Sequence, residues 1–341
     1  MIGTVWRISS YKGHLSIIGE NAQIRTELVP ARGSKLVSLM NKQTGREWIY
    51  TADQSNHAEH ANDADQSNHT DRFWKEPLSS GMAWDAADRS GWDELFPTIS
   101  PCLSPDAAFS GRQLPDHGEV WSLPWEYAIK GDDLELWVKG VQLPYLFRKT
   151  YRIEESALHI QYELQNCSSH SFSYIWAPHC LLKIEAGMKL AGKPFAGIQP
   201  PQQILMRHSK MERFESEAVY STYPFIKTKE GQIIDMRIVE PKLQLHAEKY
   251  WFVNRVTEGN ISIQAPQTKE SFQFEYSAED LPYLAIWSNY GGYWNDYNLA
   301  IEPSTSFLDD VESSSYAGKV KTIQGHSTES WYLKVSLQQD M

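Results

Sequence analysis

Three residues of this 341-residue chain combine a side chain suited to general acid/base chemistry with a local sequence typical of a functional site. They are His117, His179 and Glu302. An imidazole titrates near neutral pH, so a histidine can donate or accept a proton in water. A carboxylate whose pKa is raised by burial can act as a general base. If the fold brings these side chains together, the chain holds the groups for a proton transfer.

The first histidine lies in residues 114–126, which read LPDHGEVWSLPWE. Pro115, Asp116 and Gly118 predict a turn, and residues 120–125 then predict a short strand. The turn would present the imidazole of His117 between the carboxylates of Asp116 and Glu119. The alternative is a solvated or structural histidine, and the two later residues shift the interpretation toward a site.

The other two residues stand at the ends of apolar runs, next to a proline. His179 ends the run YIWAPH, and Glu302 precedes Pro303 in the run LAIEP. Proline fixes the backbone and disfavours helix before it, so both residues are expected at strand ends, where site residues often stand. A Glu in such a place is expected to be partly buried, and burial would raise its pKa toward the range useful to a base. A strand-end His satisfied by backbone groups is the alternative for His179.

Flat aromatic side chains are frequent, with 13 Trp and 12% aromatic residues in all. Residues 283–297 read YLAIWSNYGGYWNDY and place Trp287 and Trp294 around a Gly-Gly turn. Indole faces suit the apolar face of a sugar ring, so this segment is a candidate aromatic wall. Core packing is the alternative.

Composition excludes several classes of partner. The formal net charge is −11, and we find no cluster of Lys and Arg, so neither nucleic acid nor membrane is expected as a partner. The N-terminus lacks the pattern of a secretory signal, and no run of 18 apolar residues occurs. Cys102, Cys167 and Cys180 are too few and too scattered for a disulfide framework or a thiolate metal site. A reduced, cytoplasmic setting is expected.

Most of the chain predicts short strands separated by turns, which indicates an all-β fold. Residues 36–40 and 46–50 predict a hairpin with Gly45 at its turn. Short helical pieces are expected only around residues 205–219. No linker interrupts the pattern, so one domain over residues 1–341 is expected. The expected strands are 4–9, 15–19, 22–29, 34–41, 134–138, 145–153, 157–164, 171–177, 181–184, 243–253, 260–265, 272–276, 283–289, 299–303 and 330–336.

Residues 51–71 break this pattern. The hexapeptide ADQSNH occurs at 52–57 and again at 64–69, and the segment contains His57, His60 and His69. Imidazoles at short spacing could share a metal ion. A duplicated, exposed polar loop is the favoured interpretation, because the segment is poor in apolar residues.

In combination, DHGEVW at His117, WAPH at His179 and AIEP at Glu302 resemble the site motifs of the aldose 1-epimerases, or galactose mutarotase-like proteins. Their order and spacing fit that family, and GWDELFP at residues 91–97 is similar to a stretch seen in some members. The resemblance covers residues 24–335. It implies a large antiparallel β-sandwich (a supersandwich) and an isomerase that interconverts the α and β anomers of an aldose without metal or cofactor.

The resemblance also implies roles. Glu302 would take the proton of the anomeric hydroxyl, His179 would protonate the ring oxygen, and His117 would hydrogen-bond near that oxygen and stabilise the open form. This chain departs from the family where Cys180 and Leu181 follow His179, in place of an aromatic residue and Asn. The family's substrate-binding Arg could be Arg72 or Arg32. Its sugar-binding Asp has no clear match, and Glu248 or His246 stands near the expected place. The candidate substrate-binding residues are Trp92, Asp93, Glu94, Trp287, Trp294, Arg72 and Glu248.

Three functions remain open at this point. The first is a mutarotase acting on a free or lightly modified aldose, as monomer or homodimer, with a small carbohydrate as its partner. The second is a carbohydrate-binding protein that keeps the cleft without catalysis. The third, a glycoside hydrolase or lyase, would need paired carboxylates such as Asp93, Asp296 and Glu302, and would leave both histidines unexplained.

Overall fold

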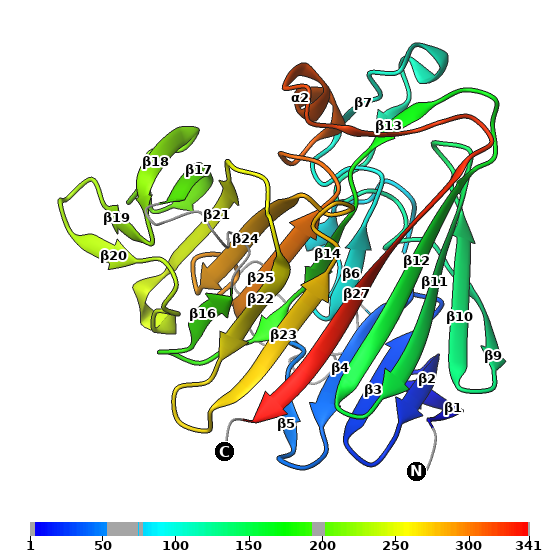
Figure 1. Cartoon of the computed structure of the whole chain (residues 1–341), viewed down its shortest axis with the longest axis horizontal. Helices are drawn as coiled ribbons and strands as arrows, with labels where there is room; N and C mark the ends of the chain where they lie inside the picture. The colour runs from blue at the N-terminus through cyan, green and yellow to red at the C-terminus, as the bar shows by residue number, and fades with distance from the viewer. Residues whose placement is uncertain (1–3, 53–73, 75–77, 193–201, 340–341) are drawn as a thin grey trace, which may run out of the picture.

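The protein is described by a computed structural model over residues 4–52, 74, 78–192 and 202–339. Its regular structure is almost entirely antiparallel β, as expected, in three large sheets and three two-stranded ribbons (Figure 1). Among the described residues, no helix is long and apolar enough to cross a membrane. The duplicated hexapeptide and its histidines lie almost wholly outside the described residues, so the two interpretations of that segment stay predictions.

The largest sheet has eight strands, and β27 runs through its middle (Figure 1, red). Period-two burial shows why its strands form: along β11, Tyr145, Phe147 and Tyr151 are buried, whereas Arg148 and Arg152 are exposed. In spatial order the strands are β16 (Lys189–Gly192), β22 (Gly259–Gln264), β23 (Glu270–Tyr276), β27 (Thr328–Gln339), β12 (Ala157–Asn166), β11 (Tyr145–Glu154), β10 (Asp133–Lys139) and β9 (Glu126–Lys130).

The six-stranded sheet carries most of the candidate site. Its strand β25 reads YNLAIEPS and is buried at seven of eight positions, in keeping with its apolar run. The order is β15 (Leu182–Lys183), β25 (Tyr297–Ser304), β24 (Tyr283–Tyr290), β21 (His246–Phe252), β17 (Gln202–Lys210) and β18 (Ala218–Tyr223).

The seven-stranded sheet holds the N-terminal strands and ends on β14, which brings His179 to the site. The predicted hairpin is confirmed: β4 pairs with β5, and Gly45 turns between them at φ 75°. The order is β1 (Val5–Tyr11), β2 (His14–Glu20), β3 (Ile24–Val29), β4 (Lys35–Asn41), β6 (Trp92–Leu95) and β14 (Ala177–Cys180), with β5 (Arg46–Glu47) on β4.

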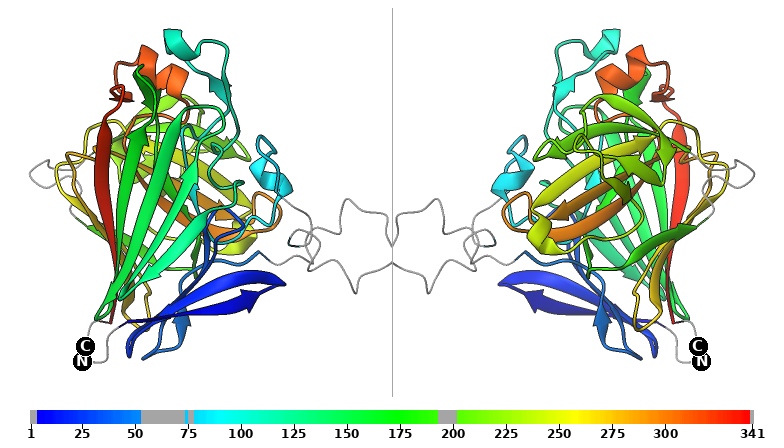
Figure 2. Two further views of the ribbon diagram at one scale, coloured as in Figure 1. Left: turned by 90° about the vertical axis from the view of Figure 1, so that its right-hand side faces the viewer. Right: turned by 90° about the vertical axis from the view of Figure 1, so that its left-hand side faces the viewer.

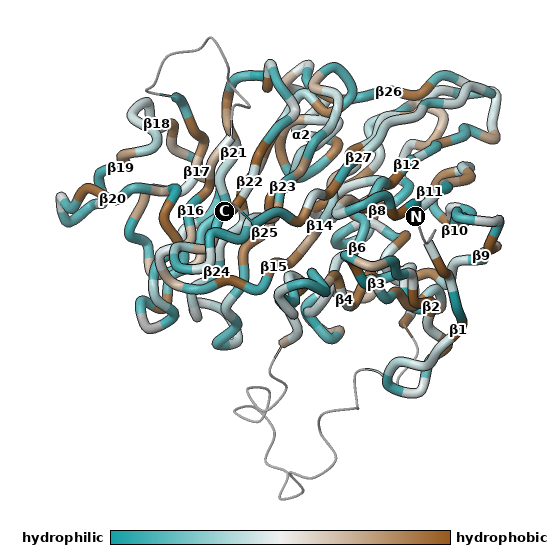
Figure 3. Tube along the Cα trace, turned by 60° about the horizontal axis from the view of Figure 1, so that its bottom comes forward, coloured by the Kyte–Doolittle hydropathy of each residue, from teal (hydrophilic) through white to brown (hydrophobic). Residues whose placement is uncertain are grey.

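Smaller elements complete the described chain. Hydrophobic segments recur along the strands (Figure 3, brown), and Figure 2 shows the sheets from the two sides. The ribbons are β7 (Cys102–Leu103) with β8 (Gln113–Leu114), β13 (Phe172–Tyr174) with β26 (Lys321–Ile323), and β19 (Phe225–Lys227) with β20 (Ile233–Asp235). The helical turns are η3 (Trp84–Ala86), η4 (Ala107–Phe109), η5 (Lys242–Gln244) and α2 (Val311–Tyr316).

Two local predictions were wrong. Residues 205–219 form the end of β17, a turn at 211–217 and the start of β18 in place of helical pieces, because β17 pairs with β21 and tertiary pairing overrides local preference. Residues 120–125 form turns in place of a strand. There the indole N–H groups of Trp121 and Trp125 donate to the backbone carbonyls of Asp116 and Val120. These two hydrogen bonds stabilise the turns.

Candidate active site

A cavity of about 540 Å³ opens over the six-stranded sheet, next to the end of β14. Its lining includes His117, His179 and Glu302, so the fold brings together the three residues that the sequence singled out. Five lining residues are acidic and three are Arg or Lys, which disfavours an anionic ligand. The charged lining residues are Asp85, Asp116, Asp296, Glu302, Asp309, Arg89, Arg207 and Lys249.

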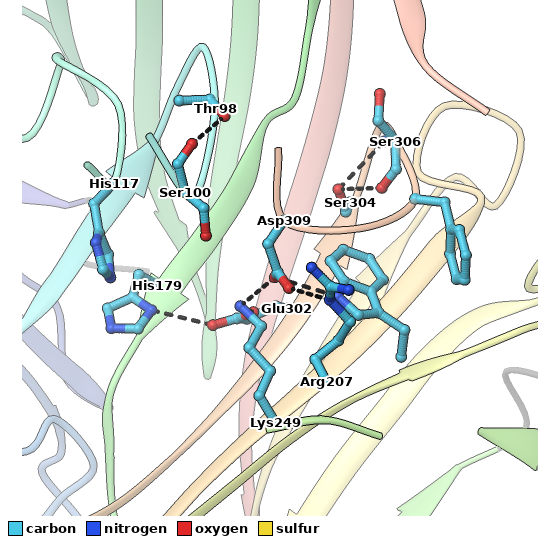
Figure 4. A network of polar contacts seen from close by, with 12 residues as sticks. Thr98, Ser100, His117, His179, Arg207, Lys249, Glu302, Ser304, Ser306 and Asp309 are labelled. Carbon is cyan, nitrogen blue, oxygen red and sulfur yellow. Dashed lines mark hydrogen bonds and ion pairs between the residues drawn. The ribbon is translucent and has the colours of Figure 1, made fainter. Parts of the chain in front are cut away.

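Glu302 lies between a histidine and a lysine (Figure 4). Its Oε1 is 3.1 Å from Nδ1 of His179, and its Oε2 is 2.7 Å from Nζ of Lys249. Lys249 also pairs with Asp309 at 3.1 Å, and Asp309 pairs with Arg207 at 3.0 Å. The carboxylate of Glu302 is fully buried, so both of its charged or polar partners matter to its protonation.

The pKa of Glu302 is lowered, where the sequence predicted that it would be raised. Burial does raise it, but Lys249 and His179 together outweigh burial and lower the pKa to about 2. Burial lowers the pKa of His179 below its usual value, and outweighs the opposing effect of Glu302. Since an ionised carboxylate only accepts hydrogen bonds, Nδ1 of His179 carries the proton and Nε2 holds the lone pair of the neutral ring.

His117 belongs to a second histidine–carboxylate pair. Its Nδ1 is 2.9 Å from Oδ1 of Asp116, and its ring centre is 5.3 Å from that of His179. Burial raises the pKa of Asp116, but the interactions with His117, together with the backbone N–H of Trp84 and the nearby His179, outweigh burial and lower the pKa. His117 itself adopts φ 57°, and Gly118 follows at φ 73°. A left-handed non-glycine residue is strained, and such residues cluster at functional sites.

Trp84 connects the two pairs, and the sequence analysis did not select it as a site residue. Its indole stacks on His117 at 4.9 Å and 15°, and meets His179 edge-on at 4.9 Å. Its backbone N–H donates to Oδ2 of Asp116, and its indole N–H donates to buried Asp93. Trp84 therefore fixes both imidazole rings relative to each other.

Lys249 is the second residue that was missed. Strand alternation in HAEKYWF places it on the same face as Ala247 and Trp251, which are both buried. The sequence did hold a signal for this residue. A Lys that alternates with apolar residues on one face of a strand is expected to point inward, and a buried Lys nearly always has a charged partner.

The far half of the cavity contains the predicted aromatic residues. Trp287 and Trp294 both line it, together with Asn298 and Asp296. The indole N–H of Trp287 donates to Oδ1 of Asn298 at 3.3 Å. Arg89 lies over the ring of Trp294 at 4.8 Å and pairs with Asp296 at 3.1 Å.

Several candidate substrate-binding residues lie away from the cavity. Trp92 is in the core, edge-on to Phe274. Asp93 forms a buried pair with Lys35 at 3.1 Å, behind Trp84. Arg32, the other candidate for the binding Arg, is buried over Trp74.

The two remaining acidic candidates are likewise committed to structural pairs. Glu94 binds Lys149, Tyr162 and Trp176, and Glu248 is held by Arg213. Neither lines the cavity. For Trp92, Asp93 and Glu94 the reason is their place on β6, which pairs with β4 and β14 inside the molecule. Successive side chains of a strand point to opposite faces, and both faces of β6 are buried. Arg72 lies outside the described residues.

Comparison with known proteins gives the fold a name. Residues 228–337 match the model of DUF4432, a domain of unknown function. No curated protein sequence matches the chain. A galactose mutarotase-like protein from Lactobacillus casei superposes with a TM-score of 0.65 at 17% identity, over 95% of this chain and 100% of that one.

Two further structures agree. An aldose epimerase homologue from C. elegans gives a TM-score of 0.59 at 10% identity, over 99% of this chain and 100% of that one. A galactose 1-epimerase from Lactobacillus acidophilus gives 0.55 at 10% identity, over the full length of both chains. The TM-scores show that these proteins share a fold with this chain, and at sequence identities this low they show the fold alone. The chain is therefore galactose mutarotase-like in fold over nearly its whole length.

Proposed function

We propose that this chain is a mutarotase that interconverts the α and β anomers of a neutral aldose. The observation that carries the proposal is the pair of histidine–carboxylate dyads, His117 with Asp116 and His179 with Glu302, which line one cavity with their imidazole ring centres 5.3 Å apart. Anomer interconversion needs one group to take the proton of O1 and another to protonate the ring oxygen O5, and two imidazoles close together supply both.

His179 is the better base. The pKa of Glu302 is about 2 and its carboxylate is bound to Lys249, so it has little tendency to take a proton. Burial keeps His179 neutral, and its hydrogen bond to Glu302 leaves Nε2 to accept the O1 proton. Glu302 then stabilises the imidazolium that forms, and so acts as a positioning residue. This assignment differs from the one that the family resemblance implied.

His117 supplies the proton to O5. In its charged form it donates from Nδ1 to Asp116 and from Nε2 to the ring oxygen. The C1–O5 bond then breaks, C1 becomes an aldehyde carbon, and rotation about C1–C2 exposes its other face. Closure reverses the proton transfers, so atoms and charges balance over the cycle.

The Lys249–Glu302 pair also favours a second candidate, a carbohydrate-binding protein without catalysis. A carboxylate that is held at low pKa by a lysine is a poor base, and a binding protein needs none. The two functions differ in one measurable property, which is acceleration of anomer exchange.

The test is polarimetry or NMR of anomer exchange with glucose, galactose and xylose. Wild type is expected to accelerate exchange for at least one sugar, and His179→Asn is expected to lose about 10²–10⁴-fold, the usual contribution of one acid or base. His159→Asn, a matched change at a half-buried histidine on β12 that does not line the cavity, is expected to keep the wild-type rate.

Glu302→Gln separates the two assignments of the base. If Glu302 positions His179, the variant keeps measurable activity. The rate of anomer exchange in the variant then still falls at low pH, because the imidazole of His179 becomes protonated. Acceleration in none of the sugars, with binding still present by calorimetry, would establish the carbohydrate-binding alternative.

A further inference from the structure

We infer that the outer edge of β1 pairs with β1 of a second copy of this chain, antiparallel and about a two-fold axis at Ile8, so that two seven-stranded sheets join into one. The inference is independent of the mutarotase function proposed above. It follows from an unprotected strand edge, from backbone groups that match those of a second copy, and from an apolar face that continues past the core.

The outer edge of β1 lies open. β1 is the last strand of its sheet and has no strand on its outer side among the described residues. In Figures 1 and 2 the hairpin of β1 and β2 (dark blue) lies at the periphery of the molecule. An edge strand invites another strand unless Lys, Pro, a bulge or a short length protects it. β1 has seven residues in regular register with β2, contains no Lys or Pro, and pairs its one charged residue, Arg7, with Glu20.

Three other edge strands of the large sheets differ from β1. β18 pairs with β17 through an irregular register, which indicates a bulge. β9 begins with Glu126 and ends with Lys130, and β16 has only four residues and begins with Lys189. Among these four edges, β1 is therefore the one that presents a regular row of backbone groups without protection.

The turn between β1 and β2 decides which backbone groups point outward. Lys12 and Gly13 form a two-residue turn with φ 47° and 84°, the positive values of a type I′ hairpin. The residues that flank such a turn are a hydrogen-bonded pair, and hydrogen-bonded pairs alternate along the ladder. The N–H and C=O groups of Trp6, Ile8 and Ser10 therefore point to the free edge, and those of the other four residues point to β2.

These outward groups are self-complementary. Ile8 is the middle residue of β1, so a two-fold axis at Ile8 places it opposite Ile8 of the second copy. The same axis places Trp6 opposite Ser10 of the second copy. Each of these pairs exchanges two hydrogen bonds, so every outward N–H and C=O group of the strand is bonded. Arg7 then lies opposite Ser9 of the second copy, and no like charges meet.

The side chains on one face of the hairpin continue the apolar core into solvent. Trp6 is buried and lies over Gly19, its neighbour on β2, whereas Ile8 and Leu15 of the same face are 50% and 43% exposed. Pairing at the two-fold axis brings the two Ile8 side chains together and removes apolar surface from water. Residues 4–20 carry two basic side chains and one acidic side chain in a chain of net charge −11, so the hairpins meet with little repulsion.

The expected dimer is weak. A seven-residue strand is much smaller than the about 20–30 residues that each partner contributes to a standard interface. We therefore expect a dissociation constant in the micromolar range.

Sedimentation velocity of the full chain across the micromolar range tests the pairing. Wild type is expected to shift from the 39.1 kDa of one chain toward twice that mass as its concentration rises. Ile8→Lys and Ile8→Glu are each expected to weaken dimerisation at least about tenfold, because like charges then meet at the axis. An equal mixture of these two variants is expected to restore the dimer, because opposite charges then meet.

Two further variants separate the edge of β1 from a general surface effect. Ser10→Pro removes an outward N–H and leaves the hydrogen bonds to β2 in place, so it is expected to lose the dimer and keep the fold by circular dichroism. Val219→Lys is the matched control, because Val219 is an exposed residue of the edge strand β18, and it keeps the wild-type dimer.

A wild-type chain that stays monomeric across this range overturns the inference, and so does a dimer that Ile8→Lys leaves intact. A mixture of the Lys and Glu variants that stays monomeric overturns the two-fold axis at Ile8. None of these measurements depends on anomer exchange, so the inference and the proposed function fail separately.

Discussion

Removing the cation beside Glu302 is the sharpest test of the electrostatics of the site. In Lys249→Met the carboxylate of Glu302 keeps, among the residues that the structure describes, only its hydrogen bond from His179, although it is fully buried. Asp309 retains Arg207 at 3.0 Å, so most of the loss falls on Glu302. Breaking a buried ion pair from one side typically costs about 3–5 kcal/mol, because an uncompensated charge is left behind.

The dependence of this loss on pH has a definite sign. In wild type, the pKa of Glu302 is about 2 in the folded state against an ordinary value of 4.5, so the carboxylate stabilises the fold above pH 4.5 and loses that contribution as pH falls toward 2. In Lys249→Met burial dominates, and the folded-state pKa is expected to rise above 4.5. The free-energy gap between wild type and variant is therefore large at pH 7, begins to shrink as pH falls through the raised pKa of the variant, and continues to shrink toward pH 2.

Urea unfolding followed by tryptophan fluorescence at pH 7 and pH 4 measures both effects. Lys249→Met/Glu302→Gln is expected to recover much of the stability lost in Lys249→Met, because the buried charge is gone. Lys130→Met is the matched control: Lys130 pairs with Glu135 at the surface, and exposed pairs contribute about 0–1 kcal/mol.

Two results would refute this reasoning. One is a cost of Lys249→Met at pH 7 no larger than that of Lys130→Met. The other is a double variant whose stability is the simple sum of the two single variants, since partners in one network must couple.

Three further predictions follow from the site. Gly118→Ala is expected to cost at least about 2 kcal/mol in urea unfolding, because the glycine has φ 73° and an added Cβ would lie 2.1 Å from the carbonyl oxygen of Phe96; a neutral result would contradict the described turn. On the acid side, the rate of anomer exchange is expected to fall only below pH 6.5, as His179 becomes protonated below its lowered pKa; an acid-side loss that begins above pH 6.5 would argue against His179 as the base. In wild type, acid unfolding by fluorescence is expected to sharpen between pH 4.5 and 2, the window set by Glu302, and Glu302→Gln should flatten that part of the curve.

The sequence by itself determined the class of fold and singled out three candidate site residues that the fold brings to one cavity. Period-two alternation is a local property, so strands such as β11 and the hairpin at Gly45 could be predicted without knowing their partners. His117, His179 and Glu302 stood out because residue type, turn and adjacent proline are visible in the chain. All three line one cavity.

Tertiary structure decided what those residues can do. The burial of Glu302 was predictable, but the direction of its pKa shift depends on Lys249, which is 53 positions away in the sequence and 2.7 Å away in space. Trp84 likewise gained its importance only by stacking on His117. Conversely, Trp92 had a promising local context and lies in the core. A pKa, a stacking contact and a cavity wall are set by neighbours in space, and local sequence does not encode which neighbours the sheets bring together.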